Sequence, residues 1–314
     1  MNQEIDFIQC KPSIAIDFTM QDLPNFKNEP NIVVLFGFPY DEGTIRNKGR
    51  AGGENGYEQI MLVLKQKLKE CNISQKVIHV GCVPKQLTLE DAHEYLYQHI
   101  AEIYYQLPQA KVIVIGGSND QSYPNFKGLV DGMQCKKLGV INIDSHLDVR
   151  PLINQNQSHS GSPFRNMLED VERFQNSKFV EFAIKGCTCS YEHYQYVLNK
   201  GGKVYFMEKD IRRLNAENQG LSAMNNVLTE FENDKNIDYI FLSFDVDSIN
   251  SAWCPGVSAP SIVGGLTNIE ALSIMERAKK SSKIKLIDLS EFNPAVECER
   301  TSNLISEMII TFIL

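Results

Sequence analysis

The sequence predicts an α/β protein whose mainly parallel sheet has about eight strands and is covered by helices on both faces. Short apolar runs, most of them rich in Val, Ile and Phe, alternate along the chain with longer amphipathic segments. Several of these runs are followed closely by Gly, Asp or Ser. Strands that alternate with helices form parallel sheets, because the crossover helices pack against the two faces.

The expected strands, in chain order, are Ile32 to Phe38, Val77 to Val80, Lys111 to Ile115, Leu138 to Ile143, Phe179 to Ile184, Lys203 to Met207, Tyr239 to Phe244 and Ile284 to Leu289. The expected helices between them include Tyr57 to Cys71, Leu89 to Leu107, Leu221 to Asn233 and Asn268 to Lys280. The last helix follows Thr267, and Glu270 stands three residues later, which predicts a capping box.

One domain spanning residues 1–314 is expected. The chain has 314 residues, of which 43% are hydrophobic, enough for one sizeable core. It contains no Pro/Gly/Ser-rich linker, no low-complexity tract and no repeat with a period of about 20–50 residues.

Composition narrows the classes of partner. The formal net charge is -8 and no basic stripe appears, so nucleic acid is not expected to bind. The net charge says little about a small-molecule substrate, which responds to local charge. No apolar stretch reaches the roughly 20 residues of a membrane span, and residues 1–11 do not resemble a signal peptide. We therefore predict a cytoplasmic protein. Its eight cysteines form no CxxC pair and are expected to be reduced.

Two predicted strands end in closely spaced acidic residues. Asp144, His146 and Asp148 follow one strand, and Asp245 and Asp247 follow another about 100 residues later. Residues at i, i+2 and i+4 of an extended segment share a face, so these side chains can converge. Clustered carboxylates repel one another unless a cation lies among them. A set of carboxylates with one imidazole favours a hard or borderline divalent ion such as Mn²⁺.

A third strand end is less specific. Gly116 and Gly117 precede Ser118 and Asn119 but lack the GxGxxG spacing of a dinucleotide-binding loop. Asn119 fits three roles, as a metal ligand, as a group that supports a ligand, or as a turn residue.

In this order, the three strand ends resemble the motifs of the arginase, or ureohydrolase, superfamily. That family has GGDHS or GGGHE, DAHxD, SxDxDxxDP and a late ExNP. The corresponding segments here are GGSND, DSHLD, SFDVDSIN and EFNP, and the similarity begins at GFPYDEG, from Gly37. The resemblance implies a three-layer α/β/α arginase-like fold that holds two Mn²⁺ ions per subunit and is often found in a homo-oligomer.

The resemblance also implies the metal ligands. Asp144 and Asp245 would bridge the two ions, His146 and Asp247 would complete the second site, and Asp148 would bind the first ion. The family usually places a histidine where this chain has Asn119, whose amide oxygen is a weaker donor that still suits Mn²⁺.

Within the superfamily the chain is most similar to the formimidoylglutamases. The segment VRPL follows DSHLD, and HSGSPFR resembles their HSGTPFR motif. These segments place Arg150 and Arg165 near the site, where guanidinium groups would bind substrate carboxylates. The alternative for both arginines is an ordinary surface salt bridge.

The implied reaction is hydrolysis of N-formimino-L-glutamate to L-glutamate and formamide, as in histidine degradation. A hydroxide shared by two metals would attack the formimidoyl carbon, Glu291 would bind the amidinium group, and His159 would be a proton shuttle to the leaving amine. A solvated loop histidine is the alternative for His159. No organic cofactor is implied.

Two other functions stay open from the sequence. One is a ureohydrolase for agmatine, arginine or guanidinobutyrate. The other is a catalytically silent, arginase-like binding protein in which Asn119 has impaired metal binding. Cys254, just beyond the second acidic strand end, is either redox-sensitive or inert packing.

Overall fold

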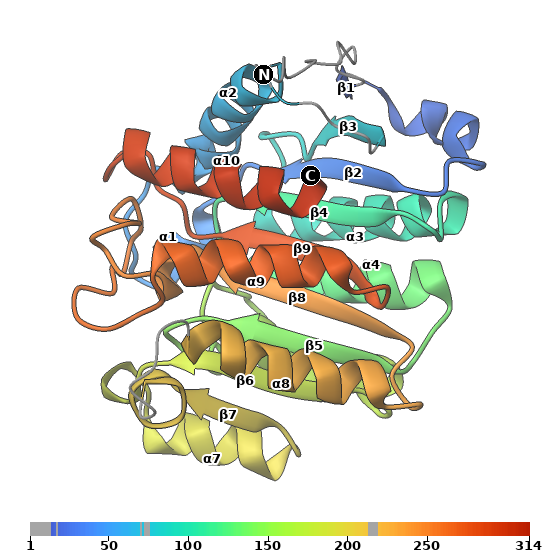
Figure 1. The fold of residues 1–314 in the computed structure, drawn as a ribbon. Helices are drawn as coiled ribbons and strands as arrows, with labels where there is room; N and C mark the ends of the chain where they lie inside the picture. Colours follow the sequence, from blue (N-terminus) through green and yellow to red (C-terminus); the bar gives the residue numbers. More distant parts are fainter. Residues whose placement is uncertain (1–13, 17, 70, 72–75, 213–218) are drawn as a thin grey trace, which may run out of the picture.

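In the computed structural model of the protein, the described residues are 14–16, 18–69, 71, 76–212 and 219–314. The nine strands of this part form one sheet in the order β1-β3-β2-β4-β9-β8-β5-β6-β7, and every neighbouring pair is parallel. Figure 1 shows the sheet between two layers of helices. The three-layer α/β/α fold is thus confirmed.

All eight expected strands are present, and the sheet has one further short edge strand, β1. The strands are β1 (Ile14–Ile16), β2 (Ile32–Phe38), β3 (Lys76–Cys82), β4 (Lys111–Gly116), β5 (Leu138–Ile143), β6 (Lys178–Ile184), β7 (Lys203–Phe206), β8 (Tyr239–Asp245) and β9 (Ile284–Ser290).

The four expected helices are also present, with bounds that differ by at most three residues from the prediction. The α-helices are α1 (Glu42–Arg46), α2 (Gly56–Leu68), α3 (Leu89–Gln106), α4 (Ser122–Met133), α5 (Pro163–Glu169), α6 (Val171–Phe174), α7 (Tyr191–Asn199), α8 (Gln219–Asn233), α9 (Asn268–Lys280) and α10 (Glu299–Ile313). The capping box of α9 is confirmed, because the Thr267 hydroxyl accepts from the Glu270 amide at 3.2 Å and the Glu270 carboxylate accepts from the Thr267 amide at 2.8 Å.

Alternate residues of the strands build two separate hydrophobic cores. On β4, Ile113 and Ile115 pack in the core with α2, α8, α9 and α10, whereas Val112 and Val114 pack in the core with α3, α4, α5 and α7. Figure 1 shows α2, α8, α9 and α10 on the same face of the sheet. A sheet buried on both faces explains why its strands are continuous apolar runs.

The strand order brings four chemically important segments together. β4, β9, β8 and β5 are successive neighbours in the sheet. Because all are parallel, their carboxyl ends meet at one edge, where α/β sheets bind their ligands. Asp245 is the last residue of β8, and the segments that follow β4, β9 and β5 contain Asn119, Glu291 and Asp144.

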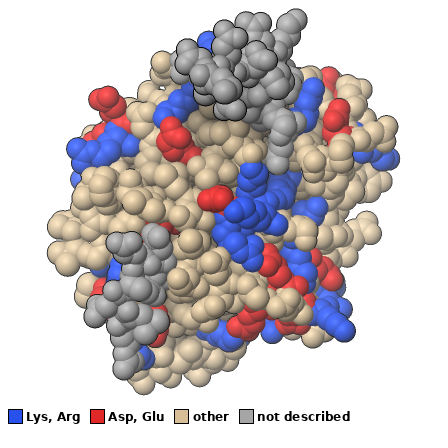
Figure 2. Space-filling model, viewed as in Figure 1, with Lys and Arg blue, Asp and Glu red and all other residues tan. Residues whose placement is uncertain are grey.

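The surface carries both signs of charge. Figure 2 shows a central group of Lys and Arg on one face, bordered by Asp and Glu. Each cysteine in the described part of the chain is a free thiol. Cys10 and the segment 1–11 lie outside the described residues. No described helix combines the length and apolar character that crossing a membrane requires.

Candidate active site

The acidic residues converge through tight turns after the strands, and not through the extended geometry expected from their spacing. β5 ends at Ile143, and Asp148 has a left-handed backbone with φ 44°. After β5, the His146 amide donates to Asp144 Oδ1 at 2.8 Å, and after β8, the Asp247 amide donates to Asp245 Oδ1 at 2.9 Å. Each turn therefore folds back on the first carboxylate of its motif.

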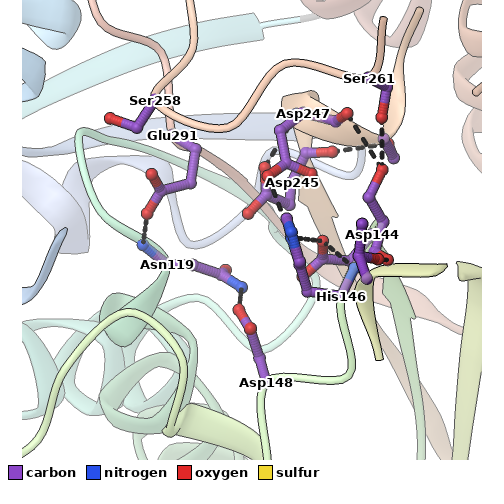
Figure 3. A network of polar contacts seen from close by, with 12 residues as sticks. Asn119, Asp144, His146, Asp148, Asp245, Asp247, Ser258, Ser261 and Glu291 are labelled. Atoms are coloured by element: carbon purple, nitrogen blue, oxygen red, sulfur yellow. Dashed lines mark hydrogen bonds and ion pairs between the residues drawn. The ribbon is translucent and has the colours of Figure 1, made fainter. Parts of the chain in front are cut away.

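The five predicted acidic and histidine ligands form two groups that share Asp144. In each group the potential ligand atoms lie within 4.8 Å of one another. The two groups are Asp144, His146 and Asp247, and Asp144, Asp148 and Asp245. Figure 3 shows His146 among the carboxylates of Asp144, Asp245 and Asp247. The residues thus offer two sets of potential cation ligands that have one carboxylate in common.

The electrostatics of the cluster require positive charge. Burial raises the pKa of Asp144 and Asp245, and the neighbouring carboxylate of Asp247 raises both further. Burial also raises the pKa of Asp148 to about 7. For His146, burial lowers the pKa, but the adjacent Asp247 and Asp144 outweigh this and hold the pKa well above its usual value.

Divalent cations fit this donor set. Asp247 Oδ1 is buried and makes no hydrogen bond among the described residues, so this oxygen is available to bind a cation. Oxygen-rich sites with a single imidazole suit hard or borderline ions. Bound cations would also offset the repulsion among the carboxylates.

Asn119 contacts one of the candidate ligands. Its amide nitrogen donates to Asp148 Oδ2 at 2.8 Å, as Figure 3 shows, and its amide oxygen accepts from the hydroxyls of Ser122 and Ser290, each at 3.0 Å. This network assigns the two ends of the amide. The amide oxygen of Asn119 therefore faces the two serines. Direct binding of a metal ion by this oxygen stays a prediction.

Glu291 lies beside the cluster in a second left-handed position, with φ 68°. Its Oε1 accepts from the Asn119 amide at 3.1 Å and from the Thr44 hydroxyl at 2.9 Å. Burial raises its pKa to about 8, and the Asn119 amide opposes this shift. A buried carboxylate held by neutral donors is suited to bind a cationic group in a pocket.

Behind Thr44 lies a buried polar chain that the sequence did not indicate. Thr44 contacts the Ser118 hydroxyl at 2.9 Å, Ser118 donates to Asp120, and Asp120 is paired with His93 of α3. Ser118 and Asp120 belong to the GGSND segment, but Thr44 and His93 lie outside the quoted motifs, and only the fold brings α1, β4 and α3 together around them.

Glu291 and the acidic cluster open into a cavity of about 190 Å³. Its walls include Asp148, Asp245, Asp247, Glu291, His146, Thr44, Asn47, Lys48, Gly49, Arg150, Ser160, Ser258 and Ala259. The acidic residues are buried, whereas Lys48 is exposed and Arg150 is partly exposed. The cavity is thus acidic inside and carries two cations nearer its mouth, and its size suits a small molecule.

Arg150 is held by neutral groups. Its Nη1 donates to Asn47 Oδ1 at 2.9 Å, and Asn47 Nδ2 donates to the Ser160 hydroxyl at 3.0 Å. No carboxylate of the described residues forms an ion pair with Arg150. Its charge is therefore available to an anionic ligand in the cavity.

Arg165 and His159 do not line this cavity. The Arg165 guanidinium donates to Val149 O at 2.7 Å, pairs with Glu169 and stacks 3.8 Å from the centre of the Tyr196 ring. His159 is buried, with Nε2 3.0 Å from Pro151 O and Nδ1 accepting from the Gly161 amide at 3.1 Å. His159 is engaged within the loop that carries Arg150 and is not solvated, whereas Arg165 forms the ordinary salt bridge that was its alternative role, with Glu169.

Cys254 is fully buried in the core. Burial raises the pKa of its thiol far above the usual value. A thiol that resists ionisation reacts slowly with oxidants, so the structure favours the inert packing role.

Together, the parallel three-layer fold and the carboxylate-rich pocket at its strand ends define an α/β enzyme with a site for divalent cations. The family model of the arginase family matches residues 31–314. The chain belongs to the arginase family, and it is a hydrolase of that family.

Individual relatives point to one branch. A formimidoylglutamase of Klebsiella pneumoniae is 28% identical over 283 residues, which cover 86% of this chain and 81% of the relative. The crystal structure of Trypanosoma cruzi formiminoglutamase with Mn²⁺ is 34% identical, with a TM-score of 0.79 and coverage of 95% of this chain and 98% of that chain. An asparagine-to-histidine variant of the same enzyme, also with Mn²⁺, has a TM-score of 0.79 and 33% identity.

Proposed function

We propose that this protein is a binuclear manganese hydrolase of linear amidines that converts N-formimino-L-glutamate and water into L-glutamate and formamide. The observation that carries the proposal is the polarity of the cavity. Buried carboxylates surround its inner part, and the cations of Arg150 and Lys48 line it nearer the mouth. The substrate has the complementary arrangement, with a cationic amidinium at one end and two carboxylates at the other.

Two Mn²⁺ ions would be held by the two groups that share Asp144, with Asn119 as a further ligand or as the group that orients Asp148. Such a pair of ions, when bound, lowers the pKa of a shared water and supplies hydroxide near neutral pH. The presence of Mn²⁺ in the Trypanosoma cruzi structures supports the choice of metal.

Glu291 would bind the amidinium through charge-assisted hydrogen bonds. The donors from Thr44 and Asn119 fix the carboxylate at Oε1 and leave Oε2 for the substrate. Burial raises the pKa of Glu291, and the positive charge of the amidinium would favour its ionised form. Glu291 would thereby hold the reacting carbon beside the acidic cluster.

Arg150 would bind one substrate carboxylate. Asn47 fixes its guanidinium at 2.9 Å without neutralising it. A planar guanidinium that lacks a protein carboxylate is a strong partner for a substrate carboxylate. Arg165 would be a further substrate contact and His159 a proton shuttle, although the engagement of their polar atoms within the protein makes both roles less favourable.

The decisive experiment is hydrolysis of N-formimino-L-glutamate by purified protein with added Mn²⁺ and after exhaustive chelation. We expect equal amounts of glutamate and formamide, and loss of turnover on chelation. Arginine, agmatine and guanidinobutyrate serve as comparison substrates with urea as the product. Urea release that exceeds formamide release would replace the proposed substrate with a guanidine.

One observation favours a second candidate, a silent arginase-like binding protein. The Asn119 oxygen contacts Ser122 and Ser290 and not the acidic cluster, which would weaken the first metal site. Elemental analysis of Mn²⁺-loaded protein separates the two candidates. Two ions per chain support the enzyme, and fewer than one ion per chain together with no hydrolysis supports the silent protein.

A further inference from the structure

We propose that Lys48 binds one of the two carboxylates of the substrate and so makes the enzyme selective for amidines with two acidic groups. The inference rests on the proposed function, because it names a specificity residue for that same cavity. Neither the acidic motifs nor the arginine-bearing segments of the sequence contain Lys48.

The backbone fixes Lys48 at the cavity wall. Lys48 directly follows Asn47, the C-cap of α1, and its amide donates to Ile45 O at 2.9 Å. The next amide, that of Gly49, donates to Thr44 O at 2.8 Å. These bonds close the end of α1 and direct the chain past the cavity that Lys48 lines.

Lys48 has a left-handed backbone, with φ 67°. Seven described residues other than glycine have positive φ, and three of them, Lys48, Asp148 and Glu291, line the cavity. Lysine is poorly suited to this conformation, which asparagine and glycine adopt more easily. Residues held in unfavourable backbone regions concentrate at functional sites, and the other two cavity residues of this kind carry the predicted chemistry.

The charge of Lys48 has no partner among the described residues. Within the described residues, Lys48 forms neither an ion pair nor a side-chain hydrogen bond. Arg150, the other cation of the cavity, is held by Asn47, which immediately precedes Lys48. One short segment therefore positions both cations, and two unpaired cations match the two carboxylates of the substrate.

Lys48→Asn is a suitable test because asparagine tolerates positive φ and removes only the long cationic side chain. Lys48→Arg is the matched control that keeps the charge. We expect Lys48→Asn to raise the KM for N-formimino-L-glutamate about 10- to 100-fold, as expected for a hydrogen bond between charged groups, with kcat changed less than about threefold. Lys48→Arg should recover most of the affinity.

Two substrate analogues show which of the two substrate carboxylates Lys48 binds. N-formimino-γ-aminobutyrate lacks the α-carboxylate, and N-formimino-norvaline lacks the side-chain carboxylate. Lys48→Asn should leave the KM of one analogue unchanged and raise the KM of the other. The assignment would be overturned if Lys48→Asn raised the KM of both analogues equally or left the KM of the full substrate unchanged. Either result would indicate that Lys48 is a solvated surface lysine.

Binding of the product separates this inference from the proposed reaction. We expect L-glutamate to bind Mn²⁺-loaded protein in calorimetry, with at least tenfold weaker binding to Lys48→Asn than to wild type. If wild type binds glutamate in this Lys48-dependent way but does not hydrolyse the formimino compound, the proposed reaction fails and the carboxylate site stands. If glutamate binds equally to both proteins or does not bind to wild type, the role of Lys48 is refuted.

Discussion

Asn119 shows how a single amide can orient a candidate metal ligand. Its N–H group donates to Asp148 Oδ2 at 2.8 Å, while two serine hydroxyls hold its oxygen. Groups that orient a ligand commonly change metal affinity 10- to 100-fold when they are removed. The replacement of the usual histidine is therefore compatible with a functional centre.

We predict that Asn119→Ala weakens Mn²⁺ binding by about 10- to 100-fold, because Asp148 loses the donor that orients it. Equilibrium dialysis measures the effect, and Asn166→Ala, which removes an amide from a bond with Ser158 outside the cavity, is the control. An Asn119→Asp variant that binds Mn²⁺ more tightly than wild type would instead indicate that an oxygen at this position reaches the ion.

For His159, the role expected from the sequence differs from the role that its contacts in the structure favour. A histidine beside a proposed active site suggests a proton donor, but both ring nitrogens of His159 are occupied by backbone groups of its own loop. These contacts fix the ring with its proton on Nε2, toward Pro151 O. The structure therefore favours a role in shaping the loop between Arg150 and α5.

We predict that His159→Ala lowers the free energy of unfolding by about 2 kcal/mol, through the loss of a buried ring and two hydrogen bonds. The shape of the pH–rate profile should stay as in wild type. Denaturant unfolding and pH-dependent kinetics check the two parts. Restoration of lost turnover by added imidazole would contradict this prediction and support the proton shuttle.

The sequence could predict the acidic ligands because their spacing is local. Asp144, His146 and Asp148 are neighbours in the chain, and one turn brings them together. Lys48 and Thr44 were missed because they approach the site from α1, more than 70 residues before Asn119. Arg165 was assigned to the site because it is near Arg150 in sequence, yet its guanidinium is directed to Glu169 and Tyr196.

At the scale of elements, β9 shows the energetic cost of a carboxyl group in a strand that is buried on both sides. It lies between β4 and β8, and its Asp288 is fully buried. Burial raises the pKa of Asp288 to about 6, although a hydrogen bond from Asn125 at 2.9 Å opposes the shift. A carboxyl group inside the central sheet thus costs stability whenever it is ionised.

The direction of the pH dependence follows from this shift. The pKa of Asp288 in the folded protein is about 6 and its usual value is 3.8, so the folded state binds more protons between these pH values. Stability therefore falls as pH rises through this window, and the cost is complete above about pH 6. We predict that Asp288→Asn stabilises the protein by on the order of 2 kcal/mol at pH 7.5 and has little effect at pH 4.

Urea unfolding of chelated protein at both pH values measures this difference, and exposed Asp238→Asn is the control. Equal stabilisation by Asp288→Asn at pH 4 and pH 7.5 would show that its carboxyl does not titrate as described. Loss of stability at both values would mean that the carboxylate bond with Asn125 outweighs the burial cost.

Elements were predictable where the apolar pattern was long enough. β2 and β5 have the expected bounds, because each is a continuous apolar run that is buried on both faces. β1 was missed because three residues carry too little pattern, and its place is defined only by pairing with β3. Helix α7 was not among the predicted helices, and only one of its residues, Val197, is buried.

At the scale of the whole molecule, the sheet order creates the site. β8 and β9 follow β5 in sequence but lie between β4 and β5 in the sheet. This insertion brings Asp245 beside Asp144 and Glu291 beside Asn119. Strand order depends on long-range packing, so the pattern of apolar runs could predict a parallel sheet but not which strand ends become neighbours.

A consequence of gathering these carboxylates is that metal binding and folding stability are linked. The repulsion and burial that raise the pKa of Asp144 and Asp245 act against the cation-free fold. Ions that bind only the folded state add about 2.7 kcal/mol per site at a free concentration of 100 times Kd. We predict that chelation lowers the Tm by several degrees and that Mn²⁺ restores it.

The double variant Asp144→Asn plus Asp245→Asn tests the origin of this linkage. Without metal it should melt above chelated wild type, because two buried charges and their repulsion are gone, and added Mn²⁺ should leave its Tm nearly unchanged. Differential scanning calorimetry with and without Mn²⁺ gives both comparisons. An equal Mn²⁺-induced rise in wild type and variant would place the stabilising ions elsewhere on the molecule and remove the basis of the metal site.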